Sequence, residues 1–183
     1  MIASKKMKLI LAPIGVATGI VFWIMFGCFV TAKFGWPQPS EILGFLPGGV
    51  QLVLGLVLLA FWLPVFAVGF YCLGRRGAVG QADTLVVNGI YKYVRNPMYS
   101  GVSFCLAGLG LVLDRTGVIL AGGAWFLLAY PQSLREQKEL LVRFGGEYAR
   151  YRKTTPMFIP SLAKVVKELM DKRGRLMRRG DGA

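Results

Sequence analysis

Histidine is absent from this chain of 183 residues, and acidic residues are few. Without histidine there is no Ser-His-Asp or Cys-His pair, and no zinc, haem or di-iron site with histidine ligands. The three cysteines, Cys28, Cys72 and Cys105, lie inside apolar runs without C-x-x-C spacing, which favours small buried side chains over a disulfide framework. Charged residues make up 17% of the chain, below the roughly 25% of soluble domains. With 55% hydrophobic residues, the composition indicates an integral membrane protein.

Long uncharged runs separate the charged residues, and four of them are long enough to match the roughly 20 residues of a membrane-spanning helix. None has the alternating polarity of a transmembrane strand. The last two runs are joined only by Asp114-Arg115-Thr116, which predicts a tight helical hairpin. We therefore predict an all-α fold: a polytopic membrane helical bundle of about four transmembrane helices with a cytoplasmic amphipathic C-terminal helical region. The predicted spans lie near residues 9–32, 50–73, 97–113 and 117–134.

Lysine and arginine are divided unevenly between the two sides of such a bundle. With four spans, 20 of the 22 basic residues fall on one side and two on the other. The positive-inside rule then predicts that both termini are cytoplasmic, and it accounts for the net charge of +13 without a nucleic-acid partner. The basic segment at residues 5–8 precedes an apolar stretch too long for a signal peptide, so we expect a retained first membrane helix.

We expect a single membrane domain over residues 1–160 and a basic tail over residues 161–183. The tail contains seven basic and three acidic residues, and Val165, Val166 and Leu169 begin a partial apolar stripe. Two interpretations fit this pattern. The tail is either a surface helix held near anionic lipid or a solvated extension.

Residues 88–101 combine a turn, an aromatic and basic segment, and a helix start. Asn96 suits the N-cap position and Pro97 the first helical position, and tyrosines at a membrane surface commonly form an interfacial belt. A helix start with free N–H groups beside Arg95 is also an anion site. The crowding of Tyr91 and Tyr99 around it favours a functional site over a turn alone.

Residues 135–160 are rich in tyrosine and in charges of both signs. On a helix continuing from the last span, Glu136, Glu139 or Leu140, and Arg143 share one face, and Gly145 or Gly146 would end that helix. Solvated charge pairs would explain this spacing. However, Glu136 lies at the predicted membrane boundary, where a carboxylate is costly without a partner, so we predict a functional role for it.

The two segments together resemble the isoprenylcysteine carboxyl methyltransferase / phospholipid methyltransferase superfamily of integral membrane enzymes. The first segment matches its G-x-Y-x-x-x-R-[HN]-P-x-Y-x-G motif, and the second matches E-x-x-x-L followed by F-G-x-E-Y-x-x-Y and proline. The resemblance covers about residues 88–160. The matching residues are Gly89, Tyr91, Arg95, Asn96, Pro97, Tyr99 and Gly101, then Glu136, Leu140, Phe144, Gly145, Glu147, Tyr148, Tyr151, Pro156 and Pro160.

The resemblance implies S-adenosylmethionine as methyl donor and a membrane lipid or amphiphilic small molecule as acceptor. Arg95 and the helix-start N–H groups would hold the donor carboxylate, while Glu136 would pair with its ammonium or ribose hydroxyls. Tyr91 and Tyr99 would pack against the adenine or face the sulfonium. Glu136 or Glu139 would be the base for an amine acceptor. The predicted cofactor-binding residues are Gly89, Tyr91, Arg95, Asn96, Pro97, Tyr99, Gly101 and Glu136; the predicted catalytic residues are Glu136, Glu139 and Arg95; the predicted substrate-binding residues are Tyr148, Tyr151 and Arg152; no metal ligand is predicted.

The chain departs from the family pattern at three positions. Asn96 replaces a histidine common before the proline, Gln137 replaces the second acid of a double-acid step, and Thr154 replaces an arginine found in many members. Asn-Pro-Met-Tyr is closer to the phospholipid branch, but ethanolamine lipids, prenylated thioether acids and small thiols all stay open as acceptors. Two other functions fit four membrane helices: a non-enzymatic scaffold or transporter subunit, and a membrane isoprenoid or sterol reductase using a nicotinamide donor.

Overall fold

The computed structural model describes residues 2–44, 49–78 and 84–180, with side chains at 18–44, 49–73, 84–171 and 173. Part of the predicted loop after the second span and the last three residues of the predicted tail lie outside these ranges. The described residues form helices and no strand. In chain order the helices are α1 (Ile2–Phe34), α2 (Pro39–Ile42), α3 (Val50–Ala78), the 3-10 helix η1 (Gly89–Lys92), α4 (Pro97–Val112), α5 (Thr116–Thr154) and α6 (Leu162–Gly180).

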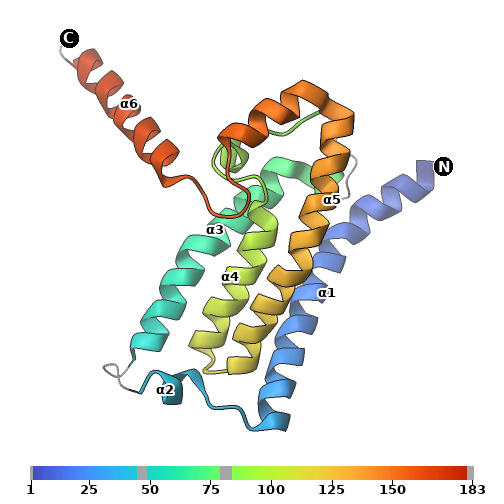
Figure 1. The fold of residues 1–183 in the computed structure, drawn as a ribbon, viewed down its shortest axis with the longest axis vertical. Helices are drawn as coiled ribbons and strands as arrows, with labels where there is room; N and C mark the ends of the chain where they lie inside the picture. Colours follow the sequence, from blue (N-terminus) through green and yellow to red (C-terminus); the bar gives the residue numbers. More distant parts are fainter. Residues whose placement is uncertain (1, 45–48, 79–83, 181–183) are drawn as a thin grey trace.

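Four long helices form a bundle in which α4 packs against both α3 and α5, and α1 packs on α5 (Figure 1). Glycine allows their backbones to approach closely. A Cβ at Gly117 would lie 2.1 Å from the carbonyl oxygen of Gly27 on α1, and the Gly117 N–H donates a hydrogen bond to Thr31 Oγ1 over 2.6 Å. Between α3 and α4, a Cβ at Gly55 would lie 2.7 Å from the carbonyl oxygen of Gly108. Such crossings at small residues are typical of membrane helices.

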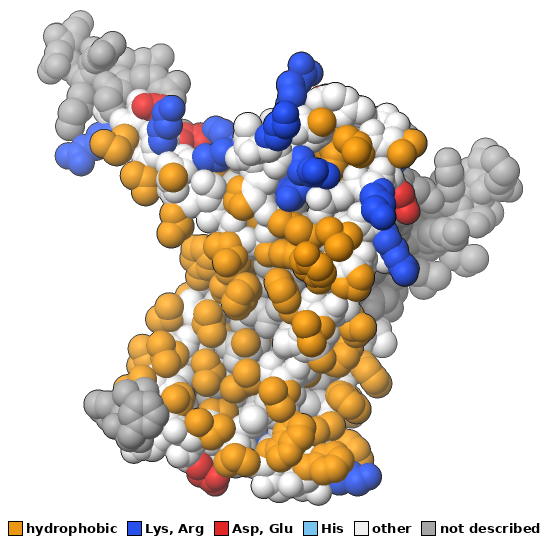
Figure 2. Space-filling view, in the orientation of Figure 1, with side chains coloured by type: hydrophobic (Ala, Val, Ile, Leu, Met, Phe, Trp, Pro, Cys, Tyr) orange, Lys and Arg blue, Asp and Glu red, His pale blue; other side chains and the backbone are white. Residues whose placement is uncertain are grey.

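The outer surface of the bundle is apolar. Val50–Leu73 and Thr116–Thr154 are helices long and apolar enough to span a membrane, and the apolar helical segments Thr18–Phe34 and Pro97–Val112 accompany them. Only 22% of the most apolar window of α3 is buried, so most of this helix faces outward and not into a protein core. Figure 2 shows a broad hydrophobic region along the middle of the bundle, with lysine and arginine gathered toward one end. The predicted all-α membrane bundle is confirmed, and the chain is an integral membrane protein.

The two ends of the bundle have different parts of the chain. Figure 1 shows α2 and the turn between α4 and α5 at one end, and both termini at the other. Asp114 in this turn has a left-handed φ of 54°. Its carboxylate accepts hydrogen bonds from the N–H (2.8 Å) and the hydroxyl (2.5 Å) of Ser40, just after the start of α2. The predicted helical hairpin is therefore present, and α2 is bound to its tip.

At the end with the termini, backbone hydrogen bonds join the segment before α4 to the segment after α5. α5 changes direction at Gly145, whose φ is 52°, and its last part turns back over the end of the bundle (Figure 1). The sequence predicts a helix end at Gly145 or Gly146, and the structure has a sharp change of direction at Gly145. The backbone pairs, donor first, are Arg95 with Pro156 (2.9 Å), Asn96 with Met157 (3.0 Å) and Ser161 with Tyr93 (3.0 Å). These bonds bring the two sequence motifs together.

Candidate functional site

A cavity of about 920 Å³ lies at the end of the bundle where the two motifs meet. Its volume is within the range of roughly 300–1,000 Å³ found for small-molecule sites. The polar part of its wall comes from η1, the start of α4 and the second half of α5. Each of the four long helices also contributes apolar side chains, among them Trp23, Phe66, Val102 and Trp125. The cavity therefore joins a polar end to a region lined by membrane-spanning helices.

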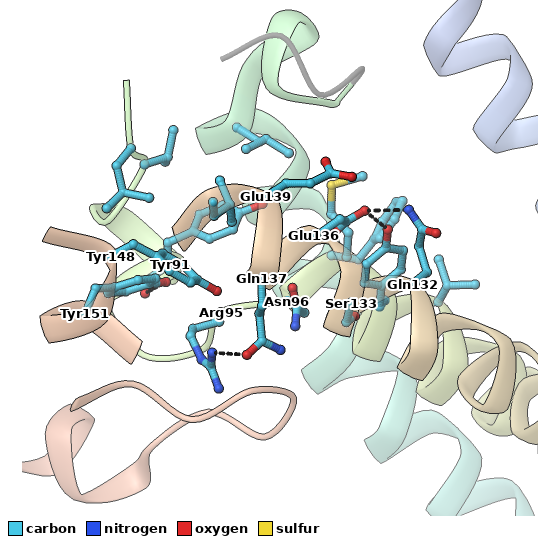
Figure 3. A pocket seen from close by; sticks show the side chains of 18 of the residues that line it. Tyr91, Arg95, Asn96, Gln132, Ser133, Glu136, Gln137, Glu139, Tyr148 and Tyr151 are labelled. Carbon is cyan, nitrogen blue, oxygen red and sulfur yellow. Dashed lines mark hydrogen bonds between the residues drawn. The ribbon is translucent and has the colours of Figure 1, made fainter. Parts of the chain in front are cut away.

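Glu136 is half-buried in the polar wall and has two hydrogen-bond donors. Its Oε1 accepts a hydrogen bond from the hydroxyl of Tyr99 over 2.5 Å and a longer one from Nε2 of Gln132 over 3.3 Å (Figure 3). Glu139 also lines the cavity and makes no hydrogen bond or ion pair with the residues that the structure describes. Within those same residues, no three histidine, cysteine, aspartate or glutamate side chains form a cluster able to hold a metal ion.

Arg95 lies on the opposite side of the polar wall and faces an amide, not a carboxylate. Its Nη1 donates a hydrogen bond to Oε1 of Gln137 over 2.9 Å (Figure 3), and the Gln137 amide donates to the sulfur of Met157 over 3.4 Å. No described aspartate or glutamate forms an ion pair with Arg95. Among the described residues, no carboxylate therefore neutralises the positive charge at this part of the cavity, which suits an anionic ligand group.

Several buried polar atoms around the cavity have no hydrogen-bond partner. Among the described residues, six buried side-chain polar atoms lack one, and four of the six belong to residues that line the cavity. Buried polar groups in proteins are nearly always paired, and a group of exceptions at one site calls for a ligand or a bound water. The four atoms are Arg95 Nε, Asn96 Nδ2, Trp125 Nε1 and Ser133 Oγ.

Three tyrosines form the side of the cavity nearest the turned-back part of α5. Tyr91 and Tyr148 are almost fully buried, the rings of Tyr148 and Tyr151 are 6.0 Å apart, and Tyr151 donates a hydrogen bond to the carbonyl oxygen of Tyr91 over 2.7 Å. Burial is the main cause that raises the pKa of all three phenols above the ordinary tyrosine value. At neutral pH they are therefore uncharged, and the hydroxyl of Tyr151 is the donor of the bond to Tyr91.

Three residues of the predicted cofactor motif do not line the cavity. A Cβ at Gly89, whose φ is 60°, would lie 2.5 Å from the sulfur of Cys72, and a Cβ at Gly101 would lie 2.7 Å from Cβ of Phe66. Pro97 is fully buried. All three pack η1 and the start of α4 against α3, so the structure assigns them a positioning role and no direct contact with the cavity.

Arg152, predicted to bind substrate, lies outside the main cavity. It lines a shallower cleft of about 570 Å³ together with Arg95 and Lys153. Arg95 belongs to the walls of both. The other predicted residues, Tyr148 and Tyr151, line the main cavity.

Sequence reasoning missed several residues of the cavity wall. Gln132 precedes Glu136 by one helical turn, so its position on the same face was available from the spacing. In the sequence, Gln137 stands out only as a departure from the motif. Its hydrogen bond with Arg95 depends on how α5 packs. No local sequence pattern predicts that α1 contributes Trp23 to the cavity wall, because this depends on the contact between α1 and α5. The remaining missed residues include Gly19, Ile20, Trp125 and Ser133.

Comparisons with known proteins cover most of the part of the chain that forms this cavity. The sequence profile of the phospholipid methyltransferase family matches residues 50–145, which include α3, η1, α4 and α5 as far as Gly145. The chain is 32% identical over 113 residues to protein-S-isoprenylcysteine O-methyltransferase of Schizosaccharomyces pombe, and 24% identical over 145 residues to the protein of that name from Rattus norvegicus. It is also 31% identical over 93 residues to the cobalt-zinc-cadmium resistance protein CzcN of Cupriavidus metallidurans.

These relatives are considerably longer than this chain. The matches cover 51%, 75% and 51% of this chain for the yeast, rat and bacterial proteins in turn, but only 48%, 49% and 41% of those proteins. The chain therefore spans about half the length of the curated relatives it matches. The profile covers more than half of this chain, and it includes the residues that form most of the polar wall.

Proposed function

Because this chain belongs to the phospholipid methyltransferase family, we propose that it is an S-adenosylmethionine-dependent methyltransferase that acts on a lipid-like amphiphile within the membrane. The main support is that Tyr91, Arg95, Tyr99 and Glu136, from two distant motifs, line one cavity, whose wall also contains four polar atoms without a partner, one of them Nε of Arg95. A non-enzymatic scaffold would not need this arrangement. The names of the yeast and rat relatives support the same reaction class.

The polar wall fits the groups of S-adenosylmethionine, which supplies an activated methyl group when bound. Arg95, which has no carboxylate partner among the described residues, would bind the donor carboxylate, and the Asn96 amide would add a hydrogen bond. Glu136 would bind the ammonium or the ribose hydroxyls, and Tyr99 holds the Glu136 carboxylate in place for that task. Tyr91 would flank the adenine or the sulfonium. Orientation of this kind is a large part of catalysis for an in-line transfer.

The apolar part of the wall suits the acceptor. A lipid-like molecule would enter from the bilayer between helices, with its chain against Trp23, Val102 and Trp125. For an amine acceptor, a carboxylate oxygen of Glu136 or Glu139 would take the proton that the amine must lose. An acid acceptor is already ionised, and it would need no base. Tyr148 and Tyr151 would contact the polar part of the acceptor.

The cleft that Arg95 shares with Arg152 and Lys153 would hold an anionic part of the acceptor, such as a phosphate or a carboxylate. The bias of lysine and arginine supports a cytoplasmic location for this end of the bundle and both termini. The soluble donor would then enter from the cytoplasm and the acceptor from the membrane.

Binding of radiolabelled S-adenosylmethionine to the detergent-purified protein tests the proposal. We expect saturable binding that weakens roughly 10- to 100-fold in Arg95→Ala and Glu136→Ala, the loss of one hydrogen bond to a charged group in each case. Arg150→Ala is the matched control, because this residue is exposed, lies outside the cavity and is not one of the residues that match the motifs. Folded protein that binds no donor at millimolar concentration would refute the proposal.

The acceptor is identified by mass spectrometry after incubation of the active protein with labelled donor and vesicles. Phosphatidylethanolamine vesicles, a prenylated cysteine and a small thiol are tested separately. Methylation of a lipid or prenylated acceptor in preference to the thiol is the expected result. Donor binding with methylation of the water-soluble thiol alone would contradict a lipid-like acceptor.

A further inference from the structure

Helix α6 has an apolar face that the protein does not cover. Leu162, Val166, Leu169 and Met170 recur at helical spacing along one side of it. Their exposed fractions are 65%, 53%, 61% and 69%. Figure 1 shows α6 extending away from the bundle, so no other described helix packs against this face.

The side of α6 that contacts the body of the protein is polar. Glu168 forms an ion pair with Lys92 of η1 over 2.6 Å and accepts a hydrogen bond from the Tyr93 hydroxyl. Lys164 donates hydrogen bonds to the carbonyl oxygen of Lys92 (3.3 Å) and to the hydroxyl of Thr155 (3.0 Å). A surface helix of a soluble protein is oriented the other way, with its apolar stripe against the core.

The position of α6 explains this reversed orientation. It leaves the bundle at the end where lysine and arginine gather, next to the hydrophobic region of the bundle, and Figure 2 shows hydrophobic side chains of its described part on the side turned toward that region. Residues 161–183 contain seven basic and three acidic residues, and Glu168 is already paired with Lys92. Basic residues beside an apolar face are what an anionic lipid surface attracts.

We propose that α6 is an interfacial helix that lies in the headgroup region of an anionic membrane leaflet, with its apolar face toward the acyl chains and its polar face bound to η1. The membrane in which the bundle is embedded is thus the partner of this face. The contact has a further consequence. Lys92 and Tyr93 lie in the chain between Tyr91 and Arg95 of the cavity wall, so a helix resting on the lipid surface is bound directly to the segment that forms the site.

Spin labelling of the full chain in lipid nanodiscs tests this proposal without any catalytic readout. In a variant with Cys28, Cys72 and Cys105 replaced by alanine, a nitroxide is attached at Val166→Cys or, as the matched neighbour, at Lys167→Cys. Both positions are exposed, so the labels disturb no packing. The measurement is the relaxation of each nitroxide by oxygen, which concentrates in the membrane, and by a nickel chelate, which stays in water. In nanodiscs that contain phosphatidylglycerol, we expect oxygen to relax mainly the label at 166 and the nickel chelate mainly the label at 167.

Equal access of the nickel chelate to both labels would overturn the proposal, because it would mean that α6 is solvated. Protection of position 166 from both reagents would also overturn it, because the face would then be covered by protein. Nanodiscs of phosphatidylcholine alone are the lipid control. There we expect the preference of position 166 for oxygen to decrease, and an unchanged preference would refute the role of anionic lipid. Because donor binding is measured separately, failure here is distinguishable from failure of the proposed methyl transfer.

Discussion

The hydroxyl of Tyr99 on α4 donates a hydrogen bond to the carboxylate of Glu136 on α5 over 2.5 Å. The two residues belong to different motifs, 37 positions apart in the chain. This bond defines the orientation of a half-buried carboxylate at the cavity wall. It also links α4 to α5 within the polar wall of the cavity.

Replacement of this hydroxyl tests whether Glu136 must be oriented. In Tyr99→Phe the carboxylate keeps its charge but loses its shorter hydrogen bond, which is worth about 1.5–3 kcal/mol when one partner is charged. We expect donor affinity, measured by isothermal titration, to fall about tenfold or more. Tyr71→Phe is the control, since Tyr71 is 86% exposed on α3. Equal donor affinity in both variants would show that the Tyr99 hydroxyl has no role.

Gly19 offers a way to separate the acceptor region from the donor region. It lines the cavity on α1, and a Cβ built there meets no atom within 4 Å. We expect Gly19→Leu to fill the apolar part of the cavity, raise the KM for the acceptor and leave the affinity for S-adenosylmethionine nearly unchanged. Gly123→Leu, at another open position but outside the cavity, should change neither quantity. A loss of donor affinity without an acceptor effect would reverse the assignment of the two regions.

The crossing of α1 and α5 should be intolerant of a single added methyl group. A Cβ at Gly117 would lie 2.1 Å from a backbone oxygen of Gly27, which cannot move independently of its helix. We expect Gly117→Ala to destabilise the bundle by about 1–3 kcal/mol, the usual cost of overpacking. Thermal unfolding in detergent measures this as a lower Tm. Gly123→Ala on the same helix, with open space around its Cβ, should preserve or raise the Tm.

Docking of α6 should weaken at high pH. The hydrogen bond to Glu168, followed by burial, raises the pKa of Tyr93 above its ordinary value of 10.0. Because docking raises this pKa, the Tyr93–Glu168 hydrogen bond contributes its full free energy to docking below pH 10.0. The contribution is lost as the pH rises through the raised pKa, because the phenol then ionises beside a carboxylate. The distribution of distances between nitroxide labels at Lys153→Cys and Lys167→Cys, measured by electron–electron resonance, should broaden as the pH rises through the raised pKa. Tyr93→Phe should reduce this pH dependence to the part that comes from Lys92 and Lys164, and an identical pH profile in both proteins would contradict the explanation.

The helices and their hydropathy could be predicted because they depend on local composition. Uncharged runs of sufficient length predict spans, and Pro97 predicts a helix start. The pair Gly145 and Gly146 predicts a helix end, and α5 turns at Gly145 with a φ of 52°. The shared face of Glu136 and Arg143 also follows from helical periodicity, and both line the cavity. The family resemblance rests on the same local patterns, and the profile match confirms it.

Other features depended on which surfaces pack together. Gly89 and Gly101 belong to the same motif as Arg95, but they pack against Cys72 and Phe66 while Arg95 lines the cavity. Side-chain direction at a motif position is decided by the neighbouring helix, which local sequence does not specify.

By itself, the sequence determined an all-helical membrane bundle with its basic residues at one end, because apolar length and charge are properties of each segment alone. Tertiary structure decided that Gln137 faces Arg95, that α1 contributes Trp23 to the cavity, and that α6 meets η1 with its polar side. Each of these relationships joins residues from different helices. Their geometry follows from how closely glycine lets those helices approach and from which backbone groups must find partners between them.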